Sequence, residues 1–129
     1  MEGAASYLLE NKKIDAIFIG ADRIVSNGDT ANKIGSSSLA IIASHYNVPF
    51  YVVAPTSSFD TSLESGENIE IEFREKEEIT SIKGVPIAPL GANVINPSFD
   101  VTRSKFIEAL FCERGKVKPV NEKEVRGLF

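Results

Sequence analysis

The stretch that decides the fold covers residues 14–35 and reads Ile14-Asp15-Ala16-Ile17-Phe18-Ile19-Gly20-Ala21-Asp22-Arg23-Ile24-Val25-Ser26-Asn27-Gly28-Asp29-Thr30-Ala31-Asn32-Lys33-Ile34-Gly35. It begins with an almost continuous apolar run, which is typical of a strand buried on both faces in a parallel sheet. A loop rich in Gly, Asn and Asp follows and leads to a helix. In open α/β sheets, ligands bind where strands end and helices begin. We therefore expect a ligand site in this loop.

Helical and strand patterns continue on both sides of this stretch. A short helix is predicted over residues 3–11. A second helix begins at the candidate N-cap residues 36–38 and ends near Asn47 and Pro49, with apolar residues at helical spacing: Leu39, Ile42, Ala43 and Tyr46. Residues 50–54 form another strand of the buried type. This strand–helix–strand order predicts a right-handed parallel crossover.

The second half of the chain is predicted to add two strands and a helix. Residues 69–74 alternate between apolar and charged side chains, which indicates a strand at an edge or with one wet face. A short strand is expected at residues 93–95. Thr102 is the candidate N-cap, and Gly115 the candidate C-cap, of a helix that carries Phe106, Ile107, Leu110 and Phe111. One more helical turn is expected in the polar tail after residue 116.

These elements predict an α/β fold. Four strands would form a doubly wound, mainly parallel sheet with helices on both faces, in a single domain over residues 1–129. Because the sheet is thin and a helix precedes its first strand, we expect a unit that either completes its sheet by oligomerising or forms the C-terminal part of a longer protein.

The composition is that of an ordinary globular domain, with 43% hydrophobic and 25% charged residues among 129. A net charge of −4 without a long basic run argues against nucleic acid and anionic membranes as main partners. No segment reaches the roughly 20 apolar residues of a membrane span. With Cys112 as the single cysteine, an intrachain disulfide is impossible and a cytoplasmic setting is expected. One cysteine and one histidine cannot form a Cys/His zinc site.

Three residues of the Gly/Asn/Asp-rich loop are candidates for chemistry. Asp22 follows the first strand, where partial desolvation suits a carboxylate to general acid–base work. The alternative is an aspartate that holds its own turn through backbone N–H groups. Asn32 and Lys33 precede a helix start, where a lysine and free helix N–H groups can face one anion. The alternative is a solvated lysine at a helix-entry turn.

Other polar residues have simpler interpretations. Residues 27–29 could form a hairpin turn, but their flanks do not alternate as strands do, so we interpret them as loop. Asn96 and Asp100 either add a polar wall or satisfy backbone groups. We expect Cys112 in the core, His45 facing solvent, and the acids of residues 70–78 on a solvated surface. The chain contains no dinucleotide-binding glycine motif, no P-loop and no Ser/His/Asp set.

Several motifs together resemble one family. They are Gly-Ala-Asp-Arg-Ile at 20–24, Asn-Gly-Asp at 27–29, Ala-Asn-Lys-Ile-Gly at 31–35, Asn-Pro-Ser-Phe-Asp-Val-Thr at 96–102 and Glu-Arg-Gly at 113–115. In this combination the chain resembles methylthioribose-1-phosphate isomerases. These enzymes share a superfamily with the regulatory subunits of translation initiation factor 2B and with archaeal ribose-1,5-bisphosphate isomerase.

The resemblance implies a Rossmann-like C-terminal domain in a homodimer. It also implies aldose–ketose isomerisation of a sugar 1-phosphate in methionine salvage, without metal or nucleotide. Asp22 matches the family's catalytic acid, and Asn32 with Lys33 matches its substrate-contacting pair. Arg23 favours this isomerase over the initiation-factor subunits and the bisphosphate isomerase.

Three departures qualify the match. The family's catalytic cysteine lies upstream of this domain, and Cys112 does not match it. The helical N-terminal domain with its phosphate-contacting Arg-Gly loop has no counterpart here. Arg103 stands where the family often has proline, which would cost the helix expected after Thr102 some preorganisation. We therefore expect this chain to carry part of a site, completed by an N-terminal part of the same protein or by a second chain.

Two other function classes remain open from sequence. One is a regulatory module that senses a sugar phosphate or nucleotide, like the initiation-factor subunits. The other is a purely structural oligomerisation domain, which has no positive support in the sequence. The intact Asp22 and Lys33 favour the enzyme.

Overall fold

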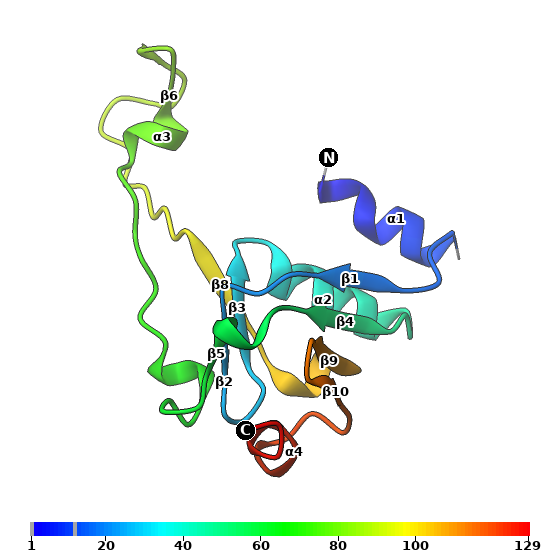
Figure 1. Ribbon diagram of the computed structural model, residues 1–129. Helices are drawn as coiled ribbons and strands as arrows, with labels where there is room; N and C mark the ends of the chain where they lie inside the picture. The colour runs from blue at the N-terminus through cyan, green and yellow to red at the C-terminus, as the bar shows by residue number, and fades with distance from the viewer. Residues whose placement is uncertain (1, 12) are drawn as a thin grey trace.

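The computed structural model describes residues 2–11 and 13–129 and has a mixed α/β architecture with open sheets (Figure 1). Within the described residues, sheet A has the strand order β1-β4-β9-β10, and sheet B has the order β5-β2-β3-β8. A small third sheet pairs β6 with β7. The α/β class predicted from sequence is therefore confirmed.

The bounds of these elements are as follows. Sheet A contains β1 (Ile17–Ile19), β4 (Phe50–Val53), β9 (Ala109–Cys112) and β10 (Gly115–Val117). Sheet B contains β2 (Arg23–Val25), β3 (Thr30–Lys33), β5 (Phe59–Asp60) and β8 (Phe99–Thr102), and the small sheet contains β6 (Ser81–Ile82) and β7 (Val85–Pro86). The α-helices are α1 (Ala5–Glu10), α2 (Ser36–His45), α3 (Glu77–Thr80) and α4 (Glu122–Arg126). Short 3-10 turns are η1 (Glu2–Ala4), η2 (Thr56–Ser58), η3 (Gly66–Asn68) and η4 (Ser104–Phe106).

Sheet A contains the parallel pairing that the sequence predicted. β1 pairs in parallel with β4, with Ile17 opposite Phe50 and Ile19 opposite Val52, and α2 lies between the two strands in the chain. β9 continues the parallel sheet beside β4, and β10 closes it with an antiparallel hairpin. The helices α1 and α2, the strands β1 and β4 and the short final helix α4 lie within a few residues of where the sequence patterns predicted them.

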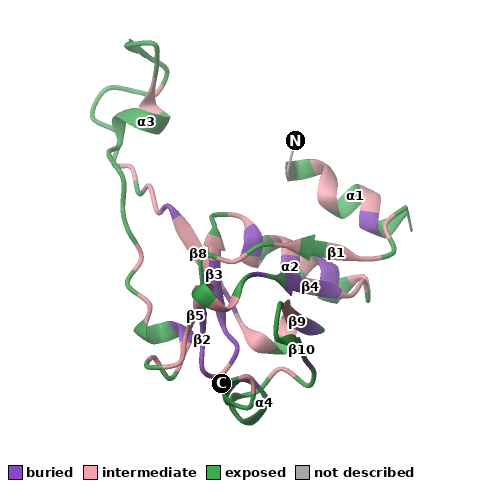
Figure 2. Cartoon of the chain, viewed as in Figure 1, coloured by how far each residue is buried: buried purple, intermediate pink, exposed green. Residues whose placement is uncertain are grey.

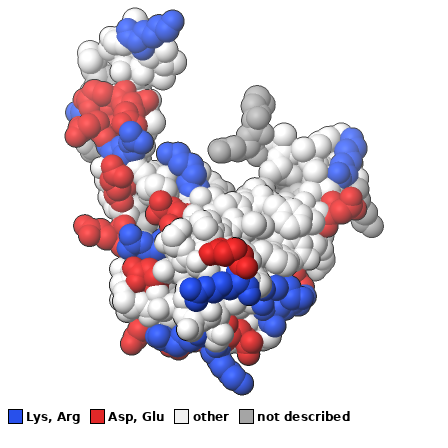
Figure 3. Space-filling view, in the orientation of Figure 1, with Lys and Arg blue, Asp and Glu red and all other residues white. Residues whose placement is uncertain are grey.

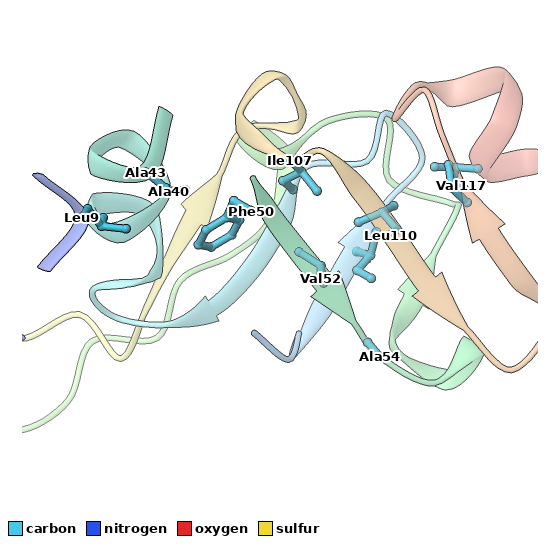
Figure 4. Close-up of a cluster of buried hydrophobic side chains, with 11 residues drawn as sticks. Leu9, Ala40, Ala43, Phe50, Val52, Ala54, Ile107, Leu110 and Val117 are labelled. Carbon is cyan, nitrogen blue, oxygen red and sulfur yellow. The ribbon is translucent and has the colours of Figure 1, made fainter. Parts of the chain in front are cut away.

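The hydrophobic core lies mainly between sheet A and the helices α1 and α2, and Ile24 of β2 and Val125 of α4 extend it (Figures 2 and 4). Its fully buried members come from both layers and include Ala40, Ala43, Phe50, Val52 and Leu110. The small side chains of Ala40 and Ala43 let α2 pack closely against the sheet. Burying Phe50 or Leu110 stabilises the fold by roughly 1.5–3 kcal/mol each.

The Asn27-Gly28-Asp29 segment is a hairpin turn, so the loop interpretation from sequence is wrong. It joins β2 to the antiparallel β3, and the N–H of Val25 donates to the carbonyl of Asp29 at 3.0 Å. Gly28 has a φ of 86°, a left-handed conformation that glycine adopts without strain. The alternation expected of hairpin strands is missing because the consecutive residues Ile24, Val25 and Ser26 are all buried, whichever way they point.

The carboxylate of Asp29 ties this turn to distant parts of the chain. It accepts hydrogen bonds from the backbone N–H of Ser104 at 2.7 Å, the backbone N–H of Gly66 at 3.1 Å and the side-chain amide of Asn27 at 3.1 Å. The Arg103 guanidinium pairs with it at 3.1 Å. Burial would raise the pKa of Asp29, but these donors outweigh it and hold the pKa below its ordinary value.

The sequence expectations for the second half of the chain are wrong in three places. Residues 69–74 form only an isolated bridge, between Phe73 and Pro97, and residues 93–95 form no strand. The helix expected after Thr102 is instead the η4 turn followed by β9. Over so short a window, the spacing of apolar residues cannot distinguish a helix from a buried strand. Gly115 accordingly begins β10 rather than capping a helix, and Thr102 lies within β8.

Residues 69–97 form an arm that extends from the body of the molecule (Figure 1). It carries α3, β6 and β7, and acidic side chains gather over α3 (Figure 3). Large apolar side chains on it are exposed, including Phe73 at 66%, Leu90 at 97% and Ile95 at 78%. The acids of residues 70–78 are all exposed, as expected.

One face of sheet A is also open in the described residues, so the expectation that its first strand is buried on both faces is wrong for this part of the protein. Phe18 on β1 is 62% exposed and stacks on Tyr51 of β4 with ring centroids 4.9 Å apart. Val53 is 48% exposed, and Phe111 of β9 contacts the Tyr51 ring edge-on at 5.8 Å. β1 is the edge strand of the sheet, since it pairs only with β4 among the described strands.

We expect the Asp29→Asn substitution to lower the free energy of unfolding at pH 7 by about 1–3 kcal/mol. The substitution replaces the buried carboxylate, which accepts from four donors, by a neutral amide with a single acceptor oxygen. The lowered pKa of Asp29 means that its contribution is present above the unfolded value, near 4, and is lost as the pH falls through the folded value. The gap between wild type and variant should therefore narrow on acidification.

Urea unfolding at a series of pH values measures this gap. Asp15→Asn, at an exposed position, is the matched control and should leave the midpoint unchanged. Equal midpoints for wild type and Asp29→Asn at pH 7 would contradict a stabilising role for Asp29.

Candidate functional site

The three candidate residues predicted from sequence lie on two adjacent backbone segments at one end of sheet B. Asp22 immediately precedes β2, and its N–H donates to the carbonyl of Ala31 on β3 at 2.9 Å. Asn32 and Lys33 are the last two residues of β3. Because β2 and β3 run antiparallel, the start of β2 and the end of β3 meet, and the hairpin turn lies at the far end.

Asn32 is held in place by its contacts with the start of α2. Its side-chain amide donates to the hydroxyl of Ser36 at 3.1 Å, and that hydroxyl donates to the carbonyl of Lys33 at 2.8 Å. Asn32 is half-buried, whereas Asp22 and Lys33 are exposed. The site therefore has one oriented amide with a carboxylate and an ammonium open to an incoming molecule.

Asp100 caps the N-terminus of α2 from another strand. It lies on β8 directly opposite Asn32 of β3, and its two carboxylate oxygens accept the N–H groups of Gly35 at 2.8 Å and Ser37 at 3.0 Å. Gly35 has a φ of 105°, which allows the sharp turn from β3 into the helix. The interpretation of Asp100 as a group that satisfies backbone N–H is confirmed.

This cap bears on one expectation about anion binding, because it occupies two of the N–H groups at the helix start. The sequence suggested that free helix N–H groups and Lys33 would face the same anion, but the N–H groups of Gly35 and Ser37 are already bonded to Asp100. The carboxylate also offsets the positive end of the helix dipole. An anion at this site would therefore depend on Lys33 more than on the helix.

Arg23, the residue after Asp22, pairs with Asp60 of the neighbouring strand β5 at 3.6 Å. The hydroxyl of Ser62 is the main cause of a lowered pKa at Asp60, and the Arg23 charge adds to it. Both partners are partly exposed, so the pair orients Arg23 without contributing much stability.

A cavity of about 500 Å³ opens beside Lys33. Residues from α1 and from the start of α2 line it: Ala4, Ala5, Leu8, Lys33, Ile34, Gly35, Ser36, Ser38, Leu39 and Ile42. The sequence did not predict this cavity, because α1 and α2 are about 30 residues apart in the chain. The helical apolar pattern of each was visible, but their packing side by side was not.

The remaining candidates lie away from this site. His45 is exposed at the end of α2, as expected. Cys112 is half-buried in β9 rather than within a helix.

Over residues 2–11 and 13–129, no three His, Cys, Asp or Glu residues are grouped to hold a metal ion. No helix in that part of the chain is long and apolar enough to cross a membrane.

Residues 1–119 match the Initiation factor 2 subunit family, and the chain belongs to that family. Its curated relatives include proteins named methylthioribose-1-phosphate isomerase. The protein from Bacillus cytotoxicus is 48% identical over 128 residues, which is 99% of this chain and 37% of the relative. The protein from Pelotomaculum thermopropionicum is 50% identical over 125 residues, covering 97% and 34%.

Solved structures give the same grouping. The 5-methylthioribose 1-phosphate isomerase of Pyrococcus horikoshii superposes with a TM-score of 0.93 at 44% identity, over 99% of this chain and 36% of that one. The delta subunit of initiation factor eIF-2B from A. fulgidus gives a TM-score of 0.87 at 35% identity, over 98% and 38%. The chain thus spans little more than a third of the length of the relatives it matches.

We expect Asp100→Ala to lower the free energy of unfolding by about 1 kcal/mol, the usual effect of removing a helix cap. It leaves the N–H groups of Gly35 and Ser37 without their acceptor, so their hydrogen exchange should accelerate. Nuclear magnetic resonance measures this exchange residue by residue. Asp15→Ala is the control, and unchanged exchange at Gly35 and Ser37 would show that Asp100 is not their cap in solution.

Proposed function

We propose that the protein containing this chain isomerises 5-methylthioribose 1-phosphate to 5-methylthioribulose 1-phosphate, an aldose–ketose conversion in methionine salvage. The observation that carries the proposal is the match along almost the whole chain, at about half identity, to relatives named for this activity. The adjacent positions of Asp22, Asn32 and Lys33 support it further, because they offer an acid–base group beside two substrate-binding groups.

In this proposal Asp22 moves protons on sugar oxygens. Opening the sugar ring needs a proton at the ring oxygen, and hydrogen then moves between C1 and C2 by an enediol or by a hydride shift. An exposed carboxylate at the start of β2 can reach a sugar placed over the adjoining end of β3, where Asn32 is held in place. General acid–base catalysis of this kind contributes about 10²–10⁴-fold to a rate.

Asn32 and Lys33 bind the sugar phosphate. The ammonium of Lys33 provides a charge-assisted contact to the phosphate, and the amide of Asn32 binds a sugar or phosphate oxygen. With Asp100 occupying the helix N-terminus, the phosphate contact rests on Lys33. We propose no metal or organic cofactor for these steps.

The chain would carry one part of this site. The catalytic cysteine implied by the family resemblance lies upstream, and Cys112 is on β9 in sheet A, apart from sheet B with Asp22. We propose that residues 1–129 form a Rossmann-like C-terminal domain and that the site is completed by an N-terminal part of the same protein or by a second chain. The cytoplasm is the expected setting.

The same upstream part or a second copy would also complete sheet A. The open edge of β1 can accept another strand, and the aromatic face formed by Phe18, Tyr51 and Phe111 can pack beneath further helices. Such additions would turn the described sheet into the doubly wound sheet expected from sequence. We further propose that the complete protein is a homodimer.

A regulatory subunit is the second candidate function, favoured by the likeness to the A. fulgidus initiation factor subunit. Such a protein would bind a sugar phosphate or nucleotide without converting it. Ribose-1,5-bisphosphate isomerase activity is the third. The Asp22-Arg23 pair favours the methylthioribose enzyme over both, and turnover assays with each substrate separate the three.

In the full-length protein, meaning this chain together with the upstream part proposed above, Asp22→Asn should lower kcat by about 10²–10⁴-fold with little change in binding. Lys33→Ala should instead raise KM by about 10-fold or more, because it removes a charged contact to the phosphate. Steady-state kinetics with 5-methylthioribose 1-phosphate measures both, and Asp15→Asn is the control.

The isolated 129-residue chain should show no turnover in the same assay. A kcat for Asp22→Asn within a few-fold of wild type would end the catalytic assignment. Turnover by the isolated chain that Asp22→Ala abolishes would overturn the proposal that the site is incomplete.

We also expect the isolated chain to self-associate at micromolar concentration, because the exposed aromatic face of sheet A is uncovered. Phe18→Ser should shift it toward monomer in light scattering and reduce its binding of an apolar dye. Tyr7→Ser, an equally exposed aromatic on α1, is the control. A compact monomer that binds no dye would contradict this expectation.

A further inference from the structure

The cavity beside Lys33 has an apolar character that the proton transfers at C1 and C2 of a sugar do not require. Five of the residues that line it are aliphatic side chains from two facing helices: Ala4, Ala5 and Leu8 from η1 and α1, and Leu39 and Ile42 from α2. All five are half-buried. Leu39 and Ile42 pack against the core on one side, whereas Ala4, Ala5 and Leu8 are outside the core cluster. A volume of about 500 Å³ is within the range of small-molecule sites.

The polar groups of the cavity lie on one side only, at the end of β3 and the start of α2. Lys33 is there with Ser36 and Ser38. The Ser36 hydroxyl already donates to the carbonyl of Lys33 and accepts from Asn32. The N–H groups of Gly35 and Ser37 are bonded to Asp100. Lys33 is therefore the principal group there that can still bind an anion.

This distribution separates the two ends of a bound molecule. A phosphate buried among aliphatic side chains would lose its hydration without gaining donors, which is costly. An apolar group placed there leaves water and fills space between α1 and α2, which is favourable. A ligand of this cavity should therefore have an anionic end near Lys33 and an apolar end against Leu8 and Leu39.

We propose that the cavity between α1 and α2 binds the apolar 5-alkylthio tail of the sugar phosphate and so selects it over sugar phosphates with a 5-hydroxyl. This inference rests on the proposed function, since it takes the sugar phosphate held by Lys33 as the substrate. The phosphate on C1 and the thioether on C5 are at opposite ends of the sugar, as the polar and aliphatic sides of the cavity require. Leu8 and Ala5 are then specificity-determining residues.

The expected discrimination follows from the chemistry of apolar pockets. One methylene group in such a pocket changes kcat/KM by about 10–200-fold, and an added hydroxyl is rejected by about 10²-fold. The full-length protein should therefore prefer 5-methylthioribose 1-phosphate over ribose 1-phosphate by about 100-fold. Most of this preference should disappear when the aliphatic wall is made polar.

Two substitutions on α1 test the aliphatic wall of the cavity through different physical changes. Leu8→Asn makes the wall polar, and because Leu8 is outside the main core cluster, the variant should still fold. Ala5→Leu keeps it apolar but fills the space. Ile41→Asn is the matched control, because Ile41 lies on α2, is 50% exposed and is not among the residues that line the cavity. Thermal melting verifies that each variant is folded.

The readout is kcat/KM for 5-methylthioribose 1-phosphate and for ribose 1-phosphate in the full-length protein. Leu8→Asn and Ala5→Leu should lower the first value by about 10–100-fold and leave the second within about 3-fold. Ile41→Asn should change neither. An absent preference in the wild type, or equal losses for both substrates in the variants, overturns the proposal while leaving the isomerase function intact. Equal losses would indicate that a segment of the protein, not the substrate, fills the cavity.

A wild type that converts neither compound refutes the proposed function instead. The affinity of the protein for the same two compounds, measured by calorimetry, then tests the cavity proposal. Tighter binding of the methylthio compound, lost in Leu8→Asn, supports it. Equal binding, or none, overturns it.

Discussion

The contact between the Asp100 carboxylate and the start of α2 joins the two sheets of this fold. Asp100 lies on β8 in sheet B, whereas α2 packs over sheet A and supplies Ala40 and Ala43 to the core. Its two oxygens take the N–H groups of Gly35 and Ser37, which would otherwise lack partners at a helix end. Because Asp100 also lies opposite Asn32 in the β3–β8 ladder, the same residue aligns the helix with the strand that carries Asn32 and Lys33. The candidate site owes its geometry to this junction.

The sequence predicted the elements whose environment is simple. β1 and β4 are short runs of apolar and aromatic residues that pair in parallel, and α2 has a regular apolar spacing after a run of serines. The β2–β3 hairpin was missed because burial on both sides erases alternation, so Thr30 and Ala31 are both buried. β9 was mistaken for a helix because four apolar residues at short spacing fit either structure. Only the pairing of β9 with β4, more than 50 residues away, decides between them.

The candidate site shows the same division between local and long-range information. Its residue types were recognisable in sequence, and so was their resemblance to a known family. The different roles of three aspartates could not be recognised from the sequence. Asp22 is exposed, Asp29 is buried under donors from Gly66, Arg103 and Ser104, and Asp100 caps a helix. The partners of Asp29 and Asp100 are up to 75 residues away, so no local pattern could assign these roles.

The arm of residues 69–97 has a consequence for how the chain can be divided. It leaves sheet B after β5 and returns at β8, and these two strands are the opposite edges of that sheet. A protease that cut only the arm would leave residues 1–68 with Asp22, Asn32 and Lys33, and residues 98–129 with Asp100. The ladder between β3 and β8, the pairing of β4 with β9 and the Asp29 contacts to Arg103 and Ser104 would still join the two pieces. The covalent connection through the arm is thus the part of the backbone that the fold needs least, and the domain is suited to reconstitution from two separately made polypeptides.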